Sequence, residues 1–165
     1  MRVSDKGIEF IKREEGLRLT AYDDIAGNIT LGYGHLVQPD DDLALTITEE
    51  EAEKILRVDL EESEHSVDSL VKVPLEQHQF DALSSWTFNL GHGNLKRSTL
   101  LKKLNAGLYS EVPKQMLRWV YAGDQNQDGV VNYEDRVAGL VKRRQREGKL
   151  LAVGDYGVSL NHQTR

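Results

Sequence analysis

The chain of 165 residues contains no cysteine, and this absence excludes a disulfide scaffold, a zinc–thiolate site, an iron–sulfur cluster and a thiol nucleophile. No apolar run approaches the roughly 20 residues that a membrane-spanning helix needs, so we expect no membrane insertion. The sequence has fewer basic than acidic residues, 21 lysines and arginines against 27 acids. The resulting net charge of −6 argues against general binding to nucleic acid. Charges interrupt the apolar residues throughout 1–15, which predicts no secretory signal. We expect a single domain over residues 1–165, large enough to fold without a disulfide or a metal.

Hydrophobic periodicity predicts a mostly helical chain with one small sheet. Ile8 and Ile11 lie at helical spacing between Ser4, a candidate N-cap, and Gly16, a candidate helix end. Apolar and polar residues alternate over 17–21 and 29–33, on either side of a turn-like segment, which predicts an antiparallel hairpin. Further helical patterns occur at 48–60 behind a Thr48–Glu51 capping box, from Pro74 to Leu90, at 100–104, around Met116, Trp119 and Val120, and at 137–151. The predicted fold class is α+β, with a helical majority and one small antiparallel sheet near the N-terminus.

Charge is distributed unevenly along the chain. Residues 39–64 contain eleven acids against two basic residues, and residues 136–149 contain six basic residues against one acid. Each cluster is expected to be a solvated helix face. The alternative for the basic segment is that it attracts an anionic polymer.

Two carboxylates and a threonine stand close to the predicted hairpin. Glu15 ends the first predicted helix, Asp24 lies near the hairpin turn, and Thr30 lies on the returning strand. A groove between helix and hairpin would hold both carboxylates, the pair that glycoside hydrolysis requires, with one protonated and one ionised. Burial against apolar walls keeps such a donor protonated near neutral pH. Taken alone, a pair of carboxylates is more often two surface charges than a catalytic site.

The residues around this pair carry a more specific pattern. Residues 15–35 read EGLRLTAYDDIAGNITLGYGH, and this arrangement closely resembles the signature of phage-type lysozymes, the endolysins or muramidases of glycoside hydrolase family 24. Later segments resemble blocks of that family in the family's order: WTFNLG at 86–91, STLLKKLNAG at 98–107, LRWVYAG at 117–123 and GLVKRR at 139–144. The resemblance runs from about Ile8 to Leu151 and implies a lysozyme-like fold.

The resemblance also implies a reaction, the hydrolysis of the β-1,4 bond between N-acetylmuramic acid and N-acetylglucosamine in peptidoglycan. It implies that Glu15 is the general acid, that Asp24 positions or deprotonates the attacking water, and that Thr30 helps to hold that water. The family is regarded as inverting, which predicts a carboxyl separation of ~6.5–9.5 Å. The chemistry itself needs no cofactor.

Several neighbouring residues receive secondary assignments. The resemblance places Tyr22, Phe88 and Asn89 along the sugar groove. His35 is a further candidate at the substrate site, although a structural hydrogen-bonding role suits it better than that of a base or metal ligand. Asp23 is expected to be an exposed turn acid, Gly32 and Gly34 to be turn or close-approach glycines, and Trp86 and Trp119 to be core residues.

An insertion at 124–135, reading DQNQDGVVNYED, has the register of a calcium loop. Oxygen-bearing side chains stand at loop positions one, three, five, nine and twelve, and a glycine stands at six, as in an EF-hand. Asp replaces the usual Glu at position twelve, as it does in the dockerin-type loops that the segment resembles. Helices are expected on both sides of the loop, and a polar surface turn is the alternative. The predicted ligands of a structural or regulatory Ca²⁺ are Asp124, Asn126, Asp128, the carbonyl of Val130, Asn132 and Asp135.

Two other functions remain open at this stage. A lytic transglycosylase breaks the same bond without water, and a non-catalytic module could bind the cell wall in a calcium-dependent manner. The expected partner is the peptidoglycan polymer, and the protein is expected to be a monomer. With no signal or anchor, the resemblance implies accumulation in the host cytoplasm and release through a separate pore-forming protein.

Overall fold

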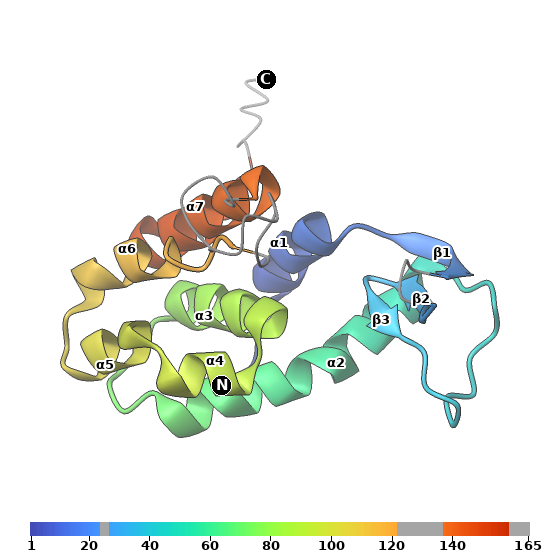
Figure 1. Ribbon diagram of the computed structural model, residues 1–165, viewed down its shortest axis with the longest axis horizontal. Helices are drawn as coiled ribbons and strands as arrows, with labels where there is room; N and C mark the ends of the chain where they lie inside the picture. The colour runs from blue at the N-terminus through green and yellow to red at the C-terminus, as the bar shows by residue number, and fades with distance from the viewer. Residues whose placement is uncertain (24–26, 122–136, 159–165) are drawn as a thin grey trace, which may run out of the picture.

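The computed structural model describes residues 1–23, 27–121 and 137–158. Figure 1 shows the strands at one end of an elongated molecule and helices α3 to α7 at the other, with α2 running between the two groups. The predicted α+β class with a helical majority is confirmed. In chain order the elements are α1 (Asp5–Glu15), β1 (Arg18–Asp23), β2 (Ile29–Gly32), β3 (His35–Leu36), α2 (Glu49–Leu70), α3 (Gln77–Leu90), α4 (His92–Arg97), α5 (Thr99–Asn105), the short 3-10 helix η1 (Tyr109–Glu111), α6 (Val112–Met116) and α7 (Ala138–Val153).

Helix α1 begins and ends where the sequence predicts. The Ser4 hydroxyl accepts a hydrogen bond from the amide of Gly7 at 3.0 Å, which satisfies one of the unpaired donors at the helix start. At the other end Gly16 has φ of 72°, a conformation that favours glycine and turns the chain out of the helix. Ile8 and Ile11 are buried, so the apolar face of α1 points into the core. The helix end therefore fixes the position of Glu15.

The predicted hairpin is confirmed and is joined by a third strand. The antiparallel order is β1-β2-β3, and Tyr22 of β1 pairs with Thr30 of β2. Two further features were not predicted: the short strand β3, and an isolated bridge between Thr20 and Thr46. Gly32, with φ of 65°, ends β2 where an added Cβ would lie 3.6 Å from Ala52 of α2. An ordinary contact would result, so the positive φ and not a lack of space favours glycine at this position.

Helix α2 starts with the predicted capping box. The Thr48 amide donates to the Glu51 carboxylate at 2.7 Å, and the Glu51 amide donates to the Thr48 hydroxyl at 3.2 Å. The helix has 22 residues and is therefore about 33 Å long. It continues to Leu70, beyond the predicted stripe that ended at Leu60.

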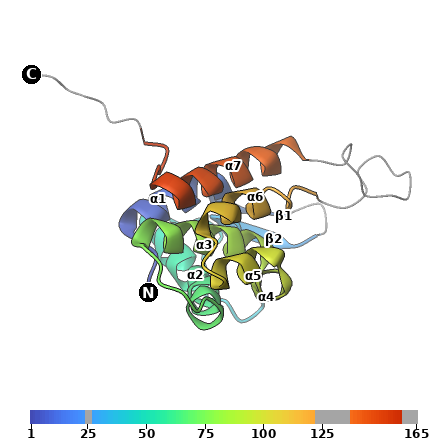
Figure 2. The same cartoon turned by 90° about the vertical axis from the view of Figure 1, so that its left-hand side faces the viewer.

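The helical group is built around α3. Phe80, Leu83 and Trp86 of this helix are fully buried, and α3 packs against α2 and α7. Figure 2 shows α7 lying along one side of the group, across α3 and α6. The start predicted at Pro74 is wrong by a few residues, because Glu76 is the N-cap and α3 begins at Gln77. Helix α4 was not predicted.

The helix predicted around Met116, Trp119 and Val120 is wrong beyond Met116. Helix α6 ends at Met116, and Trp119 and Val120 follow outside any helix. The Val120 carbonyl instead accepts a hydrogen bond from the amide of Val137, the residue that precedes α7, at 2.9 Å. Trp86 is a core residue as predicted, whereas Trp119 is only partly buried against the core.

Candidate active site

Glu15 lies at the end of α1 with its carboxylate largely enclosed by protein. The side chain is 17% exposed, and its Oε1 lies 2.8 Å from Nη1 of Arg143 on α7. Gly34, which follows β2 with φ of 77°, stands opposite, and an added Cβ there would lie 3.7 Å from Oε2 of Glu15. The carboxylate therefore meets the helical group on one side and the sheet on the other.

Arg143 belongs to a buried network of charges on α7. Its Nε contacts Oε1 of Glu147 at 2.9 Å, and Nη1 of Arg144 contacts Oε2 of Glu147 at 2.6 Å. The side chains of Glu147 and Arg144 are fully buried, and Ser85 of α3 adds a hydroxyl donor to Glu147 at 3.1 Å. Two arginines and two glutamates thus share one cluster, and the contact with Arg143 holds Glu15 in place.

Burial and charge act in opposite directions within this network. Burial raises the pKa of Glu147, since it penalises the ionised form, and the two arginines oppose that rise. Burial alone would lower the pKa of Arg143, but the charges of Glu147 and Glu15 outweigh it and raise the pKa. Arg143 is therefore a permanent cation beside Glu15. The expectation of a solvated face for residues 136–149 is wrong for Arg143 and Arg144.

A cavity of about 450 Å³ lies between the sheet side, α2 and Phe88 of α3. Gly34, the glycine next to the Glu15 carboxylate, forms part of its wall, whereas Glu15 itself is not one of the lining residues. The sheet side and α2 supply most of the remaining wall, and Phe88 of α3 closes it. The lining residues are Gly34, His35, Leu36, Gln38, Val58, Asp59, Glu62 and Phe88.

His35 is fixed in the wall of this cavity by two carboxylates. Its Nδ1 lies 2.7 Å from Asp59 of α2, and its Nε2 lies 2.9 Å from Asp41 in the loop after β3. The ring thus ties the sheet to α2, which is the structural hydrogen-bonding role expected from the sequence. Phe88 and His35 line the same cavity, and their assignment to the sugar groove stays a prediction.

The other predicted residues lie on the sheet or on α3. Thr30 is partly buried and pairs across the ladder with Tyr22, which is exposed and lies with its ring 5.1 Å from the Arg18 guanidinium. Asp24 lies outside the described residues. Asp23 is the exposed last residue of β1. Asn89 accepts a hydrogen bond from Arg144 and thereby supports the charge network.

Sequence reasoning missed the roles of Arg143 and Glu147. The segment GLVKRR was noted only as a family block, and the burial of two adjacent arginines has no signal in composition or periodicity. The four-residue spacing of Arg143 and Glu147 on one helix was a usable hint, because residues four apart face each other.

The proposed calcium ligands at 124–135 lie outside the described residues. Within the described parts of the chain, no group of three or more His, Asp or Glu side chains is arranged to hold a metal ion. Helix α7 follows the insertion as expected, but the described residues before it form no helix after Met116.

Comparison with known proteins identifies the family and the fold. The phage lysozyme family model matches residues 12–147. The endolysin of Acyrthosiphon pisum secondary endosymbiont phage 1 is 43% identical over 150 residues, covering 91% of this chain and 97% of the relative. Among solved structures, the endolysin from Escherichia coli O157:H7 phage FAHEc1 is 35% identical with a TM-score of 0.84, covering 94% of this chain and 96% of the other. The muramidase domain of SpmX from Asticaccaulis excentricus is 34% identical with a TM-score of 0.80, covering 92% of this chain and 97% of the other.

These similarities extend over the sheet, the connecting helix and the helical group, and they include the segments that carry Glu15 and Arg143. The fold is that of the phage lysozymes. The chain belongs to the phage lysozyme family and is a peptidoglycan-hydrolysing glycosidase.

Proposed function

We propose that the chain is a muramidase that cleaves the β-1,4 bond between N-acetylmuramic acid and N-acetylglucosamine, with Glu15 as general acid. The observation that carries this proposal is the position of the Glu15 carboxylate, which is mostly enclosed, is paired with Arg143 and lies next to Gly34, a residue in the wall of a cavity of about 450 Å³. A general acid must lie within hydrogen-bond reach of the leaving oxygen. Arg143, shared between Glu15 and Glu147, fixes that position.

The nucleophile in this proposal is a water molecule activated on the sheet side. Thr30 lies on β2, and Asp24 directly follows Asp23, the last residue of β1, in the sequence. Asp24 would accept the proton of the water, and the Thr30 hydroxyl would help to hold it. An attack from the face opposite the leaving group inverts the anomeric carbon, as expected for this pair.

Product analysis tests this mechanism against a lytic transglycosylase. Purified sacculi are digested in ¹⁸O-labelled water, and the muropeptides are examined by mass spectrometry. Hydrolysis predicts reducing N-acetylmuramic acid ends that carry the label. Unlabelled anhydro ends would identify a transglycosylase, and the absence of any cleavage would favour a non-catalytic wall-binding module.

We also propose that the segment 124–135 binds Ca²⁺ in a structural role. Its support is the register of oxygen ligands and the turn glycine in the sequence, together with the hydrogen bond of 2.9 Å from the amide of Val137 to the carbonyl of Val120, two described residues that precede and follow this part of the chain. Binding to the folded form alone would stabilise it by about 2.7 kcal/mol at a hundredfold excess over the Kd.

Thermal unfolding of metal-stripped protein tests the calcium proposal. Added Ca²⁺ should raise the Tm of the wild type and leave that of the Asp128→Ala variant unchanged. Equal Tm values with and without Ca²⁺ would contradict it. A regulatory role would require that wall hydrolysis, measured at a temperature where both forms are folded, also depends on Ca²⁺.

We propose that the protein acts as a monomer and reaches the wall from the host cytoplasm through a pore made by another protein. Among the described helices, none has the length and apolarity that a membrane span needs. Cells that express the chain alone should stay intact until the membrane is permeabilised and should then lyse. Lysis without permeabilisation would contradict this route.

A further inference from the structure

A chain of alternating charges leads from Glu15 into the helical group. Arg143 lies 2.8 Å from Glu15 and donates from its Nε to Glu147 at 2.9 Å. The other oxygen of Glu147 accepts a hydrogen bond from Arg144 at 2.6 Å. The side chains of these three residues of α7 are at most 7% exposed. Because water screens buried charges weakly, each of them acts on Glu15 as well as on its direct partner.

Arg143 is held mainly from the side away from Glu15. Besides the bond to Glu147, its Nη2 donates to the carbonyl of Ser85 on α3 at 3.3 Å. Oε1 of Glu15 lies close to Nη1 of Arg143 but accepts no well-aligned hydrogen bond from the described residues. The position of the cation beside Glu15 is therefore set by Glu147 and α3.

Glu147 is in turn shared between two cations. Its Oε1 also accepts from the Ser85 hydroxyl at 3.1 Å, and Nη2 of Arg144 donates to Asn89 of α3. An arginine keeps its proton even when it is buried, and contacts with two guanidinium groups favour the ionised form of Glu147. The influence of the Glu147 charge on Glu15 therefore depends on Arg144.

Further charged groups of the described segments around Glu15 are paired with one another. On the sheet side Gly34 brings no charge to Oε2 of Glu15, and α3 meets the network with two neutral side chains. The paired groups are Glu14 with Arg146 between α1 and α7, and His35 with Asp41 and Asp59 between the sheet and α2. Among the described residues, Glu147 and Arg144 are thus the charges that are linked to Glu15 through Arg143.

The role proposed for Glu15 gives this arrangement a consequence. A general acid must carry its proton when substrate is bound, whereas a cation 2.8 Å away favours loss of that proton. The negative charge of Glu147, on the other side of Arg143, opposes the cation, and Arg144 weakens that opposition. Removal of Glu147 and removal of Arg144 should therefore affect the proton of Glu15 in opposite directions.

We propose that Glu147 and Arg144 are positioning residues that set, through Arg143, the highest pH at which Glu15 still donates its proton. Both act on the cation that faces the acid and not on the sugar. The inference rests on the proposed muramidase function, in which Glu15 protonates the leaving oxygen.

The test measures kcat/KM for reducing-end release from purified sacculi as a function of pH. Glu147→Gln keeps the size of the side chain and removes the negative charge, and Arg144→Gln removes the cation that lies beyond it. The matched controls are Glu50→Gln and Lys149→Gln, which remove charges that are 81% and 68% exposed. All proteins are assayed well below the Tm of the least stable variant, and circular dichroism checks that each is folded at every pH.

The alkaline limb of this profile reports loss of the proton from the general acid. Glu147→Gln should move the limb to lower pH by about one unit, because Arg143 then acts on Glu15 unopposed. Arg144→Gln should move it to higher pH by a smaller amount, and both controls should keep the limb of the wild type. A merely structural role predicts a lower kcat with an unmoved limb. An unmoved limb in either variant, or shifts of both in the same direction, would overturn the proposal.

Two further variants separate charge from shape and provide for a single variant that does not fold. Glu147→Asp keeps the charge on a shorter side chain, so its limb should stay close to that of the wild type; a limb as low as that of Glu147→Gln would overturn the proposal. The double variant Glu147→Gln/Arg144→Gln removes one buried charge of each sign, which a protein interior tolerates better than the loss of one partner. Its limb should lie between those of Glu147→Gln and the wild type, since the nearer charge has the larger effect. A limb at the wild-type position would contradict the proposal.

An NMR titration separates failure of this inference from failure of the proposed function. If the folded wild type cleaves no wall, the muramidase proposal fails, but the ¹³C signal of the Glu15 carboxyl, assigned with Glu15→Gln, can still be followed against pH. The midpoint of that titration should be lower in Glu147→Gln and higher in Arg144→Gln than in the wild type. Equal midpoints in the three proteins would overturn the inference whether or not the protein is a muramidase.

Discussion

The buried charge network on α7 gives the sharpest quantitative prediction. Replacing Glu147 by glutamine keeps the size and shape of the side chain and removes one negative charge. Arg143, 7% exposed, would then contact only the carboxylate of Glu15, and the fully buried Arg144 would contact no carboxylate of a described residue. The change tests whether the network stabilises the fold through charge or only through packing.

The expected magnitude follows from burial. Glu147 is fully buried and accepts three hydrogen bonds at 2.6–3.1 Å, two of them from arginines. Breaking a buried ion pair on one side costs about 3–5 kcal/mol, because the remaining charge is left without compensation. For a chain of this length each kcal/mol shifts the Tm by about 2–4 °C, so a fall of roughly 6–20 °C is expected.

Urea unfolding followed by circular dichroism measures this effect. The matched control is Glu50→Gln, which removes a glutamate whose 3.3 Å pair with Lys54 is 81% and 71% exposed. That control should change the free energy of unfolding by less than about 0.5 kcal/mol. If Glu147→Gln were destabilised by less than about 1 kcal/mol relative to the control, the network would not be held together by charge.

Three smaller changes test other parts of the molecule. Burial alone lowers the pKa of His35, but the hydrogen bonds and charges of Asp41 and Asp59 outweigh burial and raise it above 6.5. The stabilisation from protonated His35 is therefore complete below pH 6.5 and is lost as the pH rises through the raised pKa. The urea midpoint of the wild type should fall over this pH range, and that of His35→Gln should fall less. An unchanged slope in the variant would contradict this. Gly34→Ala places a side chain on a residue with φ of 77°, at 3.7 Å from the Glu15 carboxylate. It should lower the free energy of unfolding by about 1–2 kcal/mol and slow wall hydrolysis. Full stability of this variant would contradict the positive φ at Gly34. Thr48→Ala should lower the free energy of unfolding by about 1 kcal/mol, whereas Thr48→Ser, which keeps the capping hydroxyl, should not. Equal stability of the two variants would show that the capping box does not stabilise α2.

Local chemistry made the N-terminal part of the fold predictable. Helix α1 begins after Ser4 and ends before Gly16, as the sequence predicts, and the capping box of Thr48 and Glu51 starts α2. The hairpin followed from alternation of apolar and polar residues. In each case the determinant lies within a few residues of the element that it specifies.

The parts that escaped prediction depend on contacts distant in sequence or on very short elements. Strand β3 has two residues and exists because β2 pairs with it, so no periodic pattern can reveal it. Trp119 has helical spacing to Met116, but it packs edge-on against Trp86 and the chain leaves the helix. Tertiary contacts override local propensity at such positions.

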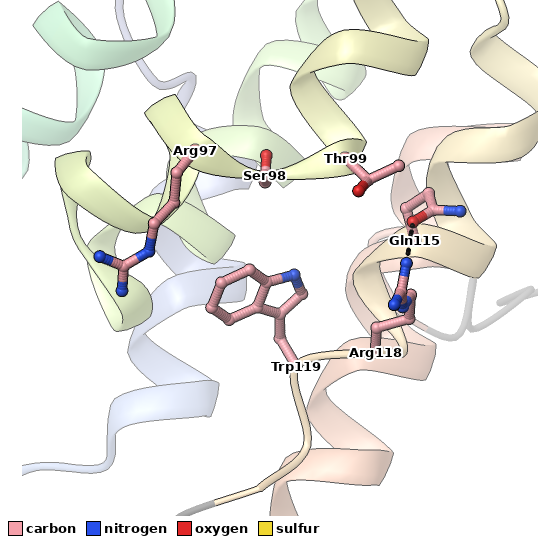
Figure 3. A pocket seen from close by; sticks show the side chains of 6 residues that line it. All are labelled: Arg97, Ser98, Thr99, Gln115, Arg118 and Trp119. Atoms are coloured by element: carbon pink, nitrogen blue, oxygen red, sulfur yellow. Dashed lines mark hydrogen bonds between the residues drawn. The ribbon is translucent and has the colours of Figure 1, made fainter.

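The candidate site was predictable only in part, for the same reason. The sequence around Glu15 and Thr30 shows a pattern specific enough to locate one side of the groove. Arg143 is 128 residues away from Glu15 in the chain, and only folding brings the two to 2.8 Å. A pocket of about 330 Å³ (Figure 3) likewise joins residues from the α4–α5 junction and the end of α6, which no local pattern connects.

The central claim, that Glu15 is the general acid of a muramidase, is tested most directly by one comparison of reducing-end release from purified sacculi. The variants are Glu15→Gln and Glu9→Gln, the latter removing an exposed glutamate on the same helix. General acid catalysis contributes about 10²–10⁴-fold, so Glu15→Gln should lose at least a hundredfold in kcat while remaining folded, and Glu9→Gln should match the wild type. Wall cleavage by folded Glu15→Gln at more than about a tenth of the wild-type rate would contradict the account.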